Sequence, residues 1–169
     1  MKKTFITGDS KQTRKLGELL AGELRGSEII CLMGELGSGK TTFSQGVLKG
    51  LGAKGPYTSP SFLVMKHYKK EFSIFNFQFS NNSQISKSKK QKKYKIPDTK
   101  YKILNIYHID AYRVGSKDVL DLGWEEIVTG ESNVVIVEWA ERIRRIIPKN
   151  AIWIKFRHKG GKEREIMIC

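Results

Sequence analysis

A glycine-rich stretch, Gly34-Glu35-Leu36-Gly37-Ser38-Gly39-Lys40-Thr41, sets narrow limits on what this chain can form. It fits the pattern G-x-x-x-x-G-K-[ST], in which a tight glycine turn brings several backbone N–H groups close to one phosphate chain. A short, largely apolar run over residues 28–33 precedes it, and residues 42–51 repeat apolar side chains at the spacing of one helix face. We therefore expect a P-loop between a buried strand and a helix whose N-terminus favours anions.

The P-loop pattern gives its polar residues distinct chemical tasks. Lys40 can reach the β- and γ-phosphates, and the Thr41 hydroxyl can hold Mg²⁺. This strand, loop and helix predict nucleotide binding, whereas hydrolysis also requires acids that orient the metal or water. The expected nucleotide-binding residues of the loop are Gly37, Ser38, Gly39, Lys40, Thr41 and Thr42.

Two acids stand where α/β proteins place their ligands, at the carboxyl ends of predicted strands. Glu138 directly follows the apolar run 134–137, and Asp110 ends the strand expected over residues 102–110. Lys40, Asp110 and Glu138 are therefore the predicted catalytic residues. Thr41, Glu138 and Asp110 are the predicted metal ligands.

Three neighbours of these acids have two interpretations each. His108 could be a base, although a lone histidine in a strand is more often structural. Arg113 could contact phosphate or pair with an acid. Trp139 could stack near the nucleotide or pack in the core, and we count it among the predicted nucleotide-binding residues.

A hydroxyl-rich loop follows the predicted P-loop helix. Thr58, Ser59 and Ser61 lie where many P-loop GTPases carry a nucleotide-sensing loop, whose hydroxyls can meet Mg²⁺ or the γ-phosphate. We therefore expect a switch-like loop, with a plain polar turn as the alternative. The chain contains no guanine-reading N-K-x-D sequence, which favours ATP over GTP as the nucleotide.

The chain has 169 residues, enough for one domain with a substantial core. Predicted strands alternate with predicted helices, and two strands around Gly160-Gly161 close the chain. The fold class expected over residues 1–169 is α/β: a single P-loop NTPase-like domain with a mixed central sheet flanked by helices and a C-terminal β-hairpin. Further strands are predicted at 5–7, 62–65, 133–138, 151–156 and 164–168, and helices from residue 9 or 10 to about 25, at 116–122 and at 140–147.

The net charge of +14 comes mainly from one segment. Residues 66–102 hold 11 lysines and 2 acids, about +9, which leaves about +5 for the rest of the chain. Residues 69–100 are expected to be a Lys-rich, flexible insertion, although residues 72–79 alternate apolar and polar and could extend the preceding strand as a hairpin arm. We favour a solvated loop for the lysine run, with an RNA-contacting arm as the alternative.

Composition also bears on the cellular setting. No apolar run approaches transmembrane length, and the first residues lack the apolar core of a signal peptide. Cys31 falls in a predicted buried strand and Cys169 is the last residue, so we expect no disulfide framework. These features favour a reducing, cytoplasmic setting without membrane contact.

Four motifs of the chain belong together: the P-loop with Thr42 and Phe43, residues 58–62 with Tyr68 beyond them, residues 107–113, and residues 137–139. In this order along the chain, they resemble the TsaE (YjeE) family of small bacterial ATPases. That family is required to make threonylcarbamoyladenosine (t6A) at position 37 of ANN-decoding tRNAs.

The resemblance implies roles for individual residues. Lys40 would bind phosphate, and Thr41 and Glu138 would be the Mg²⁺ ligands. Asp110 would be an essential acid near the metal or water, and Trp139 would lie beside the nucleotide. Two departures are the hydroxyl residue Ser61, where the family usually has threonine, and the long Lys-rich insertion after Tyr68.

The resemblance also implies partners. Family members dock on the TsaD–TsaB pair, where carbamoyl transfer to tRNA takes place, so tRNA would be met only through the complex. ATP binding and hydrolysis would drive a cycle of assembly and release that resets the transferase. The leading hypothesis is therefore an ATPase that is weak alone and stimulated by these partners.

Two other classes of function account for part of the pattern. A small-molecule kinase could use Arg142, Arg144 and Arg145 as a lid, although these residues fall on a predicted helix after Glu138. A nonenzymatic RNA-binding module would rely on the lysine run.

Overall fold

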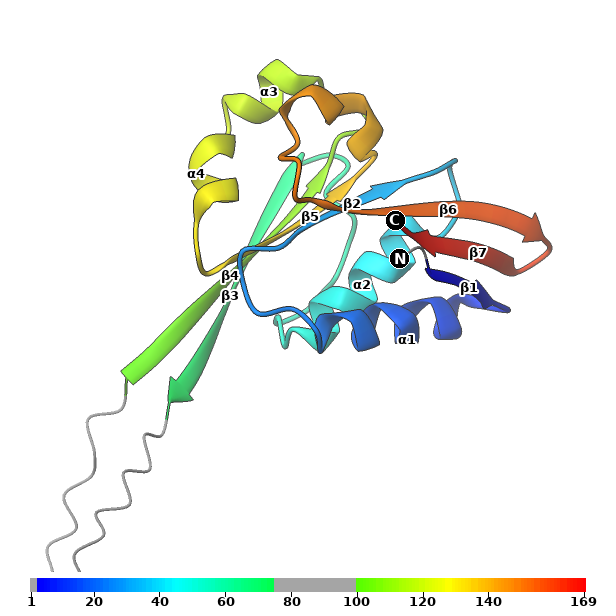
Figure 1. Ribbon diagram of the computed structural model, residues 1–169, viewed down its shortest axis with the longest axis horizontal. Helices are drawn as coiled ribbons and strands as arrows, with labels where there is room; N and C mark the ends of the chain where they lie inside the picture. Colours follow the sequence, from blue (N-terminus) through cyan, green and yellow to red (C-terminus); the bar gives the residue numbers. More distant parts are fainter. Residues whose placement is uncertain (1–2, 75–99) are drawn as a thin grey trace, which may run out of the picture.

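The computed structural model describes residues 3–74 and 100–169 of the chain (Figure 1). Strands and helices alternate along most of these residues. The elements are β1 (Lys3–Thr7), α1 (Ser10–Ala21), β2 (Ile29–Met33), α2 (Lys40–Gly50), β3 (Met65–Ile74), β4 (Lys100–Asp110), α3 (Ser116–Leu120), α4 (Trp124–Thr129), β5 (Asn133–Glu138), the 3₁₀ helix η1 (Ala140–Ile146), β6 (Ile152–Gly160) and β7 (Glu163–Ile168).

The seven strands of the described residues form one sheet in the order β1-β7-β6-β2-β5-β4-β3. Strand β2 runs parallel to β5 and to β6, and β4 runs parallel to β5. The outer pairs, β1 with β7, β6 with β7 and β3 with β4, are antiparallel. The predicted mixed α/β sheet with a C-terminal hairpin is therefore confirmed.

Helices cover both faces of this sheet (Figure 1). On one face lie α1 and α2, over a core that includes Phe43 and Val47. On the other face lie α3, α4 and η1, over a second core that includes Trp124 and Ile143. The sheet thus separates two hydrophobic layers, and its central strands are shielded from water on both sides.

The apolar run in β5 follows from this arrangement. Val134 and Ile136 pack into the core on the α1–α2 side, while Val135 and Val137 pack into the core on the other side. Because successive side chains of a strand point to opposite faces, a strand covered on both faces is apolar throughout. The run leads directly to Glu138, the last residue of β5, which lies at the carboxyl edge of the sheet.

Three predicted helices have different limits in the structure. Helix α1 ends at Ala21 rather than near residue 25, because the N–H of Gly22 donates to the carbonyl of Leu19 at 3.1 Å and caps the helix. The helix expected over 116–122 ends at Leu120, and a second helix, α4, begins after Gly123, whose φ of 81° is left-handed. The helix expected over 140–147 is the 3₁₀ helix η1, with a non-helical Ile143 inside it.

The strand predicted over residues 62–65 is wrong except for its last residue. The chain turns here, with the N–H groups of Leu63 and Val64 both donating to the carbonyl of Pro60, at 2.8 and 2.7 Å. Val64 has a φ of 65°, which lies outside the strand region and is rare for a β-branched residue. Strand β3 begins only at Met65, so residues 58–64 are a loop.

Strands β3 and β4 form a long antiparallel pair, from Met65 opposite Ile109 to Ile74 opposite Lys100. The pair extends beyond the helical layers as an arm (Figure 1). The predicted insertion over 69–100 therefore starts inside β3, and the predicted strand extension holds as far as Ile74. The lysine run lies outside the described residues, so its flexibility and its RNA alternative stay predictions.

The two cysteines are free and lie in different surroundings. Cys31 is buried in β2, and this burial raises the pKa of its thiol to about 12, whereas Cys169 is exposed. None of the helices in the described ranges is long and apolar enough to cross a membrane.

Candidate functional site

The P-loop joins β2 to α2, and its backbone requires glycine. Gly34, Gly37 and Gly39 have φ angles of 141°, 72° and 104°, which side chains rarely allow. A Cβ atom on Gly34 would lie 2.4 Å from the carbonyl oxygen of Phe156 in β6, closer than non-bonded atoms approach. The hydroxyl of Ser38 is buried in the loop without a hydrogen-bond partner among the described residues. The loop is thus a compact cradle with polar groups still to satisfy.

Lys40 begins α2, and its side chain turns back toward the loop. Its Nζ donates to the carbonyl oxygens of Gly34 and Glu35 at 2.6 and 2.9 Å, and lies 3.7 Å from the ring centroid of Trp139. Burial lowers the pKa of the Lys40 ammonium, and the negative charge of Glu138 partly opposes this shift. A partly desolvated ammonium beside the loop attracts phosphate more strongly than one in water.

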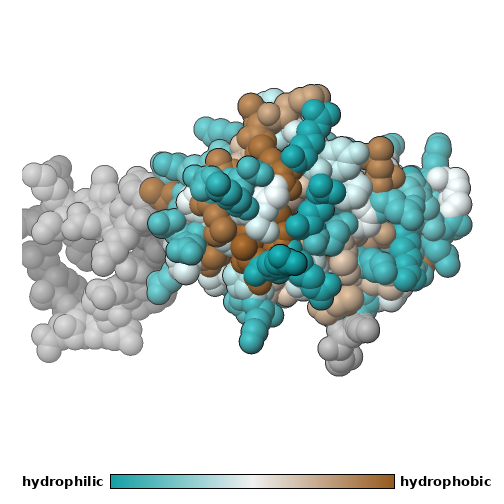
Figure 2. All heavy atoms as spheres, turned by 90° about the horizontal axis from the view of Figure 1, so that it is seen from above, coloured by the Kyte–Doolittle hydropathy of each residue, from teal (hydrophilic) through white to brown (hydrophobic). Residues whose placement is uncertain are grey.

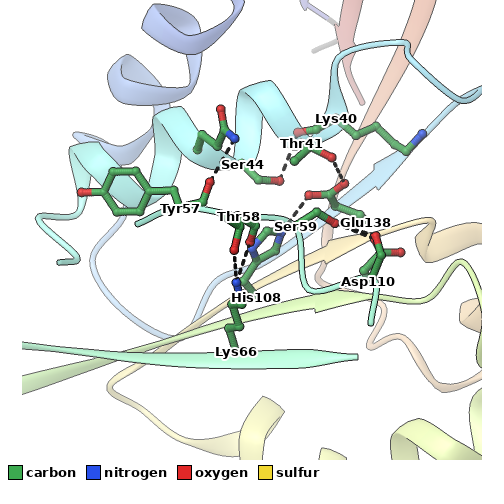
Figure 3. Close-up of polar contacts among 12 residues, drawn as sticks. Lys40, Thr41, Ser44, Tyr57, Thr58, Ser59, Lys66, His108, Asp110 and Glu138 are labelled. Atoms are coloured by element: carbon green, nitrogen blue, oxygen red, sulfur yellow. Dashed lines mark hydrogen bonds and ion pairs between the residues drawn. The ribbon is translucent and has the colours of Figure 1, made fainter. Parts of the chain in front are cut away.

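Thr41 and Glu138 meet although 97 positions separate them in the sequence. The Thr41 hydroxyl donates to Oε2 of Glu138 at 2.6 Å (Figure 3). The carboxylate is 1% exposed, and its Oε1 lies 2.7 Å from Nε2 of His108. The structure therefore joins two of the three predicted metal ligands, and it shows His108 in contact with one of them.

Asp110 contacts the switch-like loop. Its Oδ2 accepts hydrogen bonds from the hydroxyls of Ser59 and Ser61, at 2.9 and 2.5 Å. Its Oδ1 accepts from the backbone N–H of Tyr112 at 2.9 Å, and its own N–H donates to the carbonyl of Val64 at 2.9 Å. Both carboxylate oxygens of Asp110 thus accept hydrogen bonds from backbone or hydroxyl groups of nearby segments. A metal-binding role for Asp110 stays a prediction.

The three hydroxyls of the switch-like loop have different partners. The hydroxyl oxygens of Ser59 and Ser61 lie 2.7 Å from each other, and both hydroxyls donate to Asp110. Thr58 is exposed and bonds the ammonium of Lys66, the second residue of β3. The loop is therefore fixed to Asp110 on its inner side and to β3 on its outer side.

Trp139 lies directly after β5 in a left-handed conformation, with a φ of 58°. Its ring packs 4.9 Å from the ring of Tyr112 at an angle of 41°, and it covers the ammonium of Lys40. Trp139 thus packs against a neighbour and borders the P-loop, and its stacking near the nucleotide stays a prediction. Sequence reasoning gave no role to Tyr112.

A cleft of about 380 Å³ opens between the P-loop, the ends of β4 and β5, and the switch-like loop. Thr58 and Ser59 are the predicted site residues that do not line it. Its lining also includes Arg113, which stacks over Phe62 at 5.0 Å. The lining residues are Leu36, Gly37, Ser38, Gly39, Lys40, Thr41, Thr42, Ser61, Phe62, Asp110, Tyr112, Arg113, Glu138 and Trp139.

A second cleft, of about 510 Å³, lies on another side of the P-loop. The start of α1 and the C-terminal hairpin form its walls, with Lys11, Lys162 and Arg164 among the lining residues. The Nε of Arg164 donates to the carbonyl of Gly37 at 3.3 Å, and the His158 ring lies 3.3 Å from the carbonyl of Leu36.

The contact of the hairpin with the P-loop escaped sequence reasoning. The hairpin was expected only to close the sheet, yet its tip holds two carbonyl groups of the loop. The available signal was a cluster of cationic residues, 155–164, around the Gly160-Gly161 turn. Such a cluster is usually a solvated surface, so composition alone gave no reason to place it beside the P-loop.

The three arginines considered for a kinase lid lie elsewhere. Arg142, Arg144 and Arg145 are exposed on η1 and do not line the cleft beside Glu138. Arg144 stacks over the ring of Trp153 at 5.0 Å. Their position on a solvated helix agrees with the simpler of the two interpretations.

Comparison with known proteins gives one consistent result. A family model described as "Threonylcarbamoyl adenosine biosynthesis protein TsaE" matches residues 7–166. The tRNA threonylcarbamoyladenosine biosynthesis protein TsaE of Bacillus subtilis is 29% identical over 160 residues, which cover 95% of this chain and 80% of the relative. The protein of the same name from a Nostoc species is 33% identical over 149 residues, which cover 85% of this chain and 70% of that relative.

A solved structure agrees with the sequence relatives. The crystal structure of YdiB from Bacillus subtilis matches this fold with a TM-score of 0.68 and 26% sequence identity, over 99% of this chain and 84% of YdiB. The family match spans the P-loop, both acids and most of the C-terminal hairpin. The chain therefore belongs to the TsaE family, whose members are named for the biosynthesis of threonylcarbamoyladenosine in tRNA.

Proposed function

We propose that this protein is a magnesium-dependent ATPase that acts with the TsaD–TsaB pair in forming t6A at position 37 of ANN-decoding tRNAs. The observation that carries the proposal is the 2.6 Å hydrogen bond between the Thr41 hydroxyl and Glu138. P-loop NTPases hold Mg²⁺ with the P-loop Ser or Thr and an acid that ends a neighbouring strand. Thr41 is the threonine of the P-loop, and Glu138 is the acid that ends the neighbouring strand β5.

The residues present fit a magnesium ion. In the described part of the chain, no three His, Cys, Asp or Glu side chains form a metal-binding group by themselves. Mg²⁺ in NTPases needs no such cage, because one or two carboxylates, substrate phosphates and water complete its shell. Thr41 and Glu138 would hold the ion, with Asp110 near it, and the bound ion would neutralise charge on the β- and γ-phosphates.

The two clefts suit the two ends of ATP. Lys40 and the backbone of the P-loop favour the phosphates in the cleft that contains Thr41 and Glu138. The cleft beside Lys11, Lys162 and Arg164 adjoins the same loop and has room for the sugar and base. We therefore assign the hairpin tip to the nucleotide site, in addition to the residues that the sequence predicted.

Exposed apolar residues support a protein partner at the nucleotide cleft. Leu36 and Phe62 line that cleft and are 76% and 85% exposed, and Leu63 beside them is 67% exposed. Large apolar side chains at a rim are typical of a surface that another protein covers. This surface suits docking on TsaD–TsaB, with tRNA contacted through the complex in the cytoplasm.

A second apolar region lies on the face that α3, α4 and η1 cover. Figure 2 shows apolar side chains in a band across this face, between hydrophilic side chains. Leu120 and Leu122 are 40% and 39% exposed, less than half the exposed fraction of Phe62. The nucleotide cleft therefore has the more prominent apolar rim, and we place the docking surface there.

ATP turnover with and without the partners tests the proposal. The purified protein should hydrolyse ATP slowly in Mg²⁺ and faster when TsaD–TsaB is added. Lys40→Ala should abolish nucleotide binding or turnover in both conditions, because it removes the only lysine of the P-loop. Equal rates with and without the partners would contradict the partner-dependent role, and phosphate transfer to a metabolite would favour the small-molecule kinase.

A further inference from the structure

His108 is buried behind the carboxylate of Glu138, with Thr41 bound to the other carboxylate oxygen (Figure 3). The side chains of His108 and Glu138 are each 1% exposed. They come from the neighbouring parallel strands β4 and β5, in which His108 lies opposite Ile136. The sheet therefore fixes the distance between the ring and the carboxylate through backbone hydrogen bonds on both sides.

The chemistry of this contact assigns the hydrogen. A carboxylate only accepts, so Nε2 of His108 carries the hydrogen and donates it to Oε1 of Glu138 over 2.7 Å. The other ring nitrogen, Nδ1, is buried with no hydrogen-bond partner among the described residues. A fully buried ring that leaves one nitrogen unsatisfied costs free energy, and the one polar contact that this ring makes with described residues is with the carboxylate.

The two oxygens of Glu138 thus have separate partners. Oε1 accepts from His108, and Oε2 accepts from the Thr41 hydroxyl at 2.6 Å. Rotation about the last bond of a glutamate side chain is otherwise broad and nearly two-fold. A donor fixed on one oxygen removes that freedom and leaves the second oxygen facing the P-loop threonine.

We propose that His108 is a positioning residue for Glu138: it sets the rotation of the carboxylate so that a single oxygen is presented beside Thr41. The inference rests on the proposed function, in which Thr41 and Glu138 hold the metal of a bound nucleotide. Hydrogen-bond partners of metal ligands commonly contribute 10–100-fold to metal affinity. His108 therefore belongs to the metal site without touching metal or nucleotide itself.

The competing explanation is that His108 only fills space in the core. Glutamine and asparagine separate the two explanations, because the amide nitrogen of glutamine reaches the place of Nε2, whereas that of asparagine reaches only the place of Nδ1. His108→Gln keeps a donor for Glu138, and His108→Asn keeps a polar side chain without that donor. His108→Leu removes the donor and keeps an apolar filling.

The experiment measures Mn²⁺ affinity of the ADP complex by electron paramagnetic resonance, and ADP affinity in EDTA for the same proteins. We expect His108→Asn and His108→Leu to weaken Mn²⁺ binding by about 10–100-fold, with ADP affinity in EDTA unchanged. His108→Gln should stay within about threefold of the wild type. Thermal unfolding confirms that each variant is folded. If either His108→Asn or His108→Leu does not fold, the other variant gives the comparison with His108→Gln.

The possible results separate this inference from the proposed function. Failure of the wild-type protein with ADP to bind Mn²⁺ would overturn both the metal site and the role of His108. If the wild type binds Mn²⁺ and His108→Asn binds it with the same affinity, the role of His108 alone would be overturned. A loss in His108→Gln as large as in His108→Leu would likewise point to ring packing rather than to the hydrogen bond.

Discussion

Asp110 and Glu138 occupy equivalent positions in the sheet and yet have different partners. They end the neighbouring parallel strands β4 and β5, lie opposite each other in register, and are 4% and 1% exposed. Glu138 accepts from Thr41 of the P-loop, whereas Asp110 accepts from Ser59 and Ser61 of the switch-like loop. Two acids with the same position relative to their strands thus reach two different parts of the site.

Strand order explains this difference. Strand β5 lies next to β2, whose carboxyl end continues into the P-loop, so Glu138 faces the start of α2. Strand β4 lies one position further out and pairs with β3, which the switch-like loop precedes. We therefore expect Glu138 to act mainly on the metal and Asp110 mainly on the conformation of the loop.

Glu138→Ala tests the metal side of this comparison and should have the largest effect. Removal of a ligand should weaken metal binding by more than about 100-fold, because even the hydrogen-bond partner of a ligand contributes 10–100-fold. ADP binding in EDTA should persist, since the P-loop is intact. Mg²⁺ titration of ATP turnover and calorimetry of ADP binding measure the two effects, and unchanged metal dependence would assign the metal to other groups.

Asp110→Ala tests the loop side. The change leaves the Ser59 and Ser61 hydroxyls and the Tyr112 N–H without their charged acceptor, so we expect a loss of about 2–3 kcal/mol in the free energy of unfolding. Hydrogen exchange should accelerate most in residues 58–64. Urea unfolding and exchange mass spectrometry check these expectations.

The metal dependence of the same variant decides between the two roles. In Asp110→Ala, metal affinity should fall by much less than in Glu138→Ala. An equal loss of metal affinity in the two variants, with the loop still protected from exchange, would assign Asp110 to the metal and remove the distinction between the acids.

Two substitutions within the loop make a finer comparison. Ser61→Ala removes one partly buried hydrogen bond to Asp110 and should cost about 1 kcal/mol in the free energy of unfolding. Thr58→Ala, at an exposed position bonded to Lys66, should stay within about 0.5 kcal/mol of the wild type. Urea unfolding of both variants provides the test. Equal costs would mean that the loop gains nothing from its bond to Asp110.

The sequence predicted the centre of the site better than its surroundings. The P-loop and the run before Glu138 depend on local patterns, and the carboxyl-edge rule brings Thr41 and Glu138 together across 97 positions. Residues 62–64 read as a strand because they are apolar, but Leu63 and Val64 turn back onto Pro60. Local apolar character did not reveal this turn.

The residues that sequence reasoning missed depend on contacts between distant segments. Arg164 bonds the carbonyl of Gly37, 127 positions earlier, and His158 approaches Leu36, 122 positions earlier. The sequence gives the hairpin but not the direction in which its side chains point after the sheet has formed. For His108, the decisive fact was the buried partner on β5, which a lone histidine in a predicted strand cannot reveal.

Thiol reactivity can show whether the variants alter the site alone or also open the core beneath α3, α4 and η1, in which Cys31 is buried. Cys31 lies opposite Val137, next to Glu138, and burial raises its pKa to about 12, whereas a free thiol titrates near 8.5. At pH 8 a thiol reagent should therefore label Cys169 of the folded protein and leave Cys31 unlabelled. This result is expected for the wild type, Glu138→Ala and Asp110→Ala, each at urea concentrations below its unfolding midpoint.

The same shift gives a pH dependence with a definite sign. Above about pH 8.5 the unfolded chain loses the Cys31 proton while the folded chain keeps it, so the free energy of unfolding should fall as pH rises. Cys31→Ala should reduce this fall, and urea midpoints between pH 7.5 and 10 measure it. Rapid labelling of Cys31 in folded Asp110→Ala would mean that the substitution opens the core beneath α3, α4 and η1, because the thiol is buried in that core. The contrast between the two acids would then reflect the packing of this core rather than their separate hydrogen bonds.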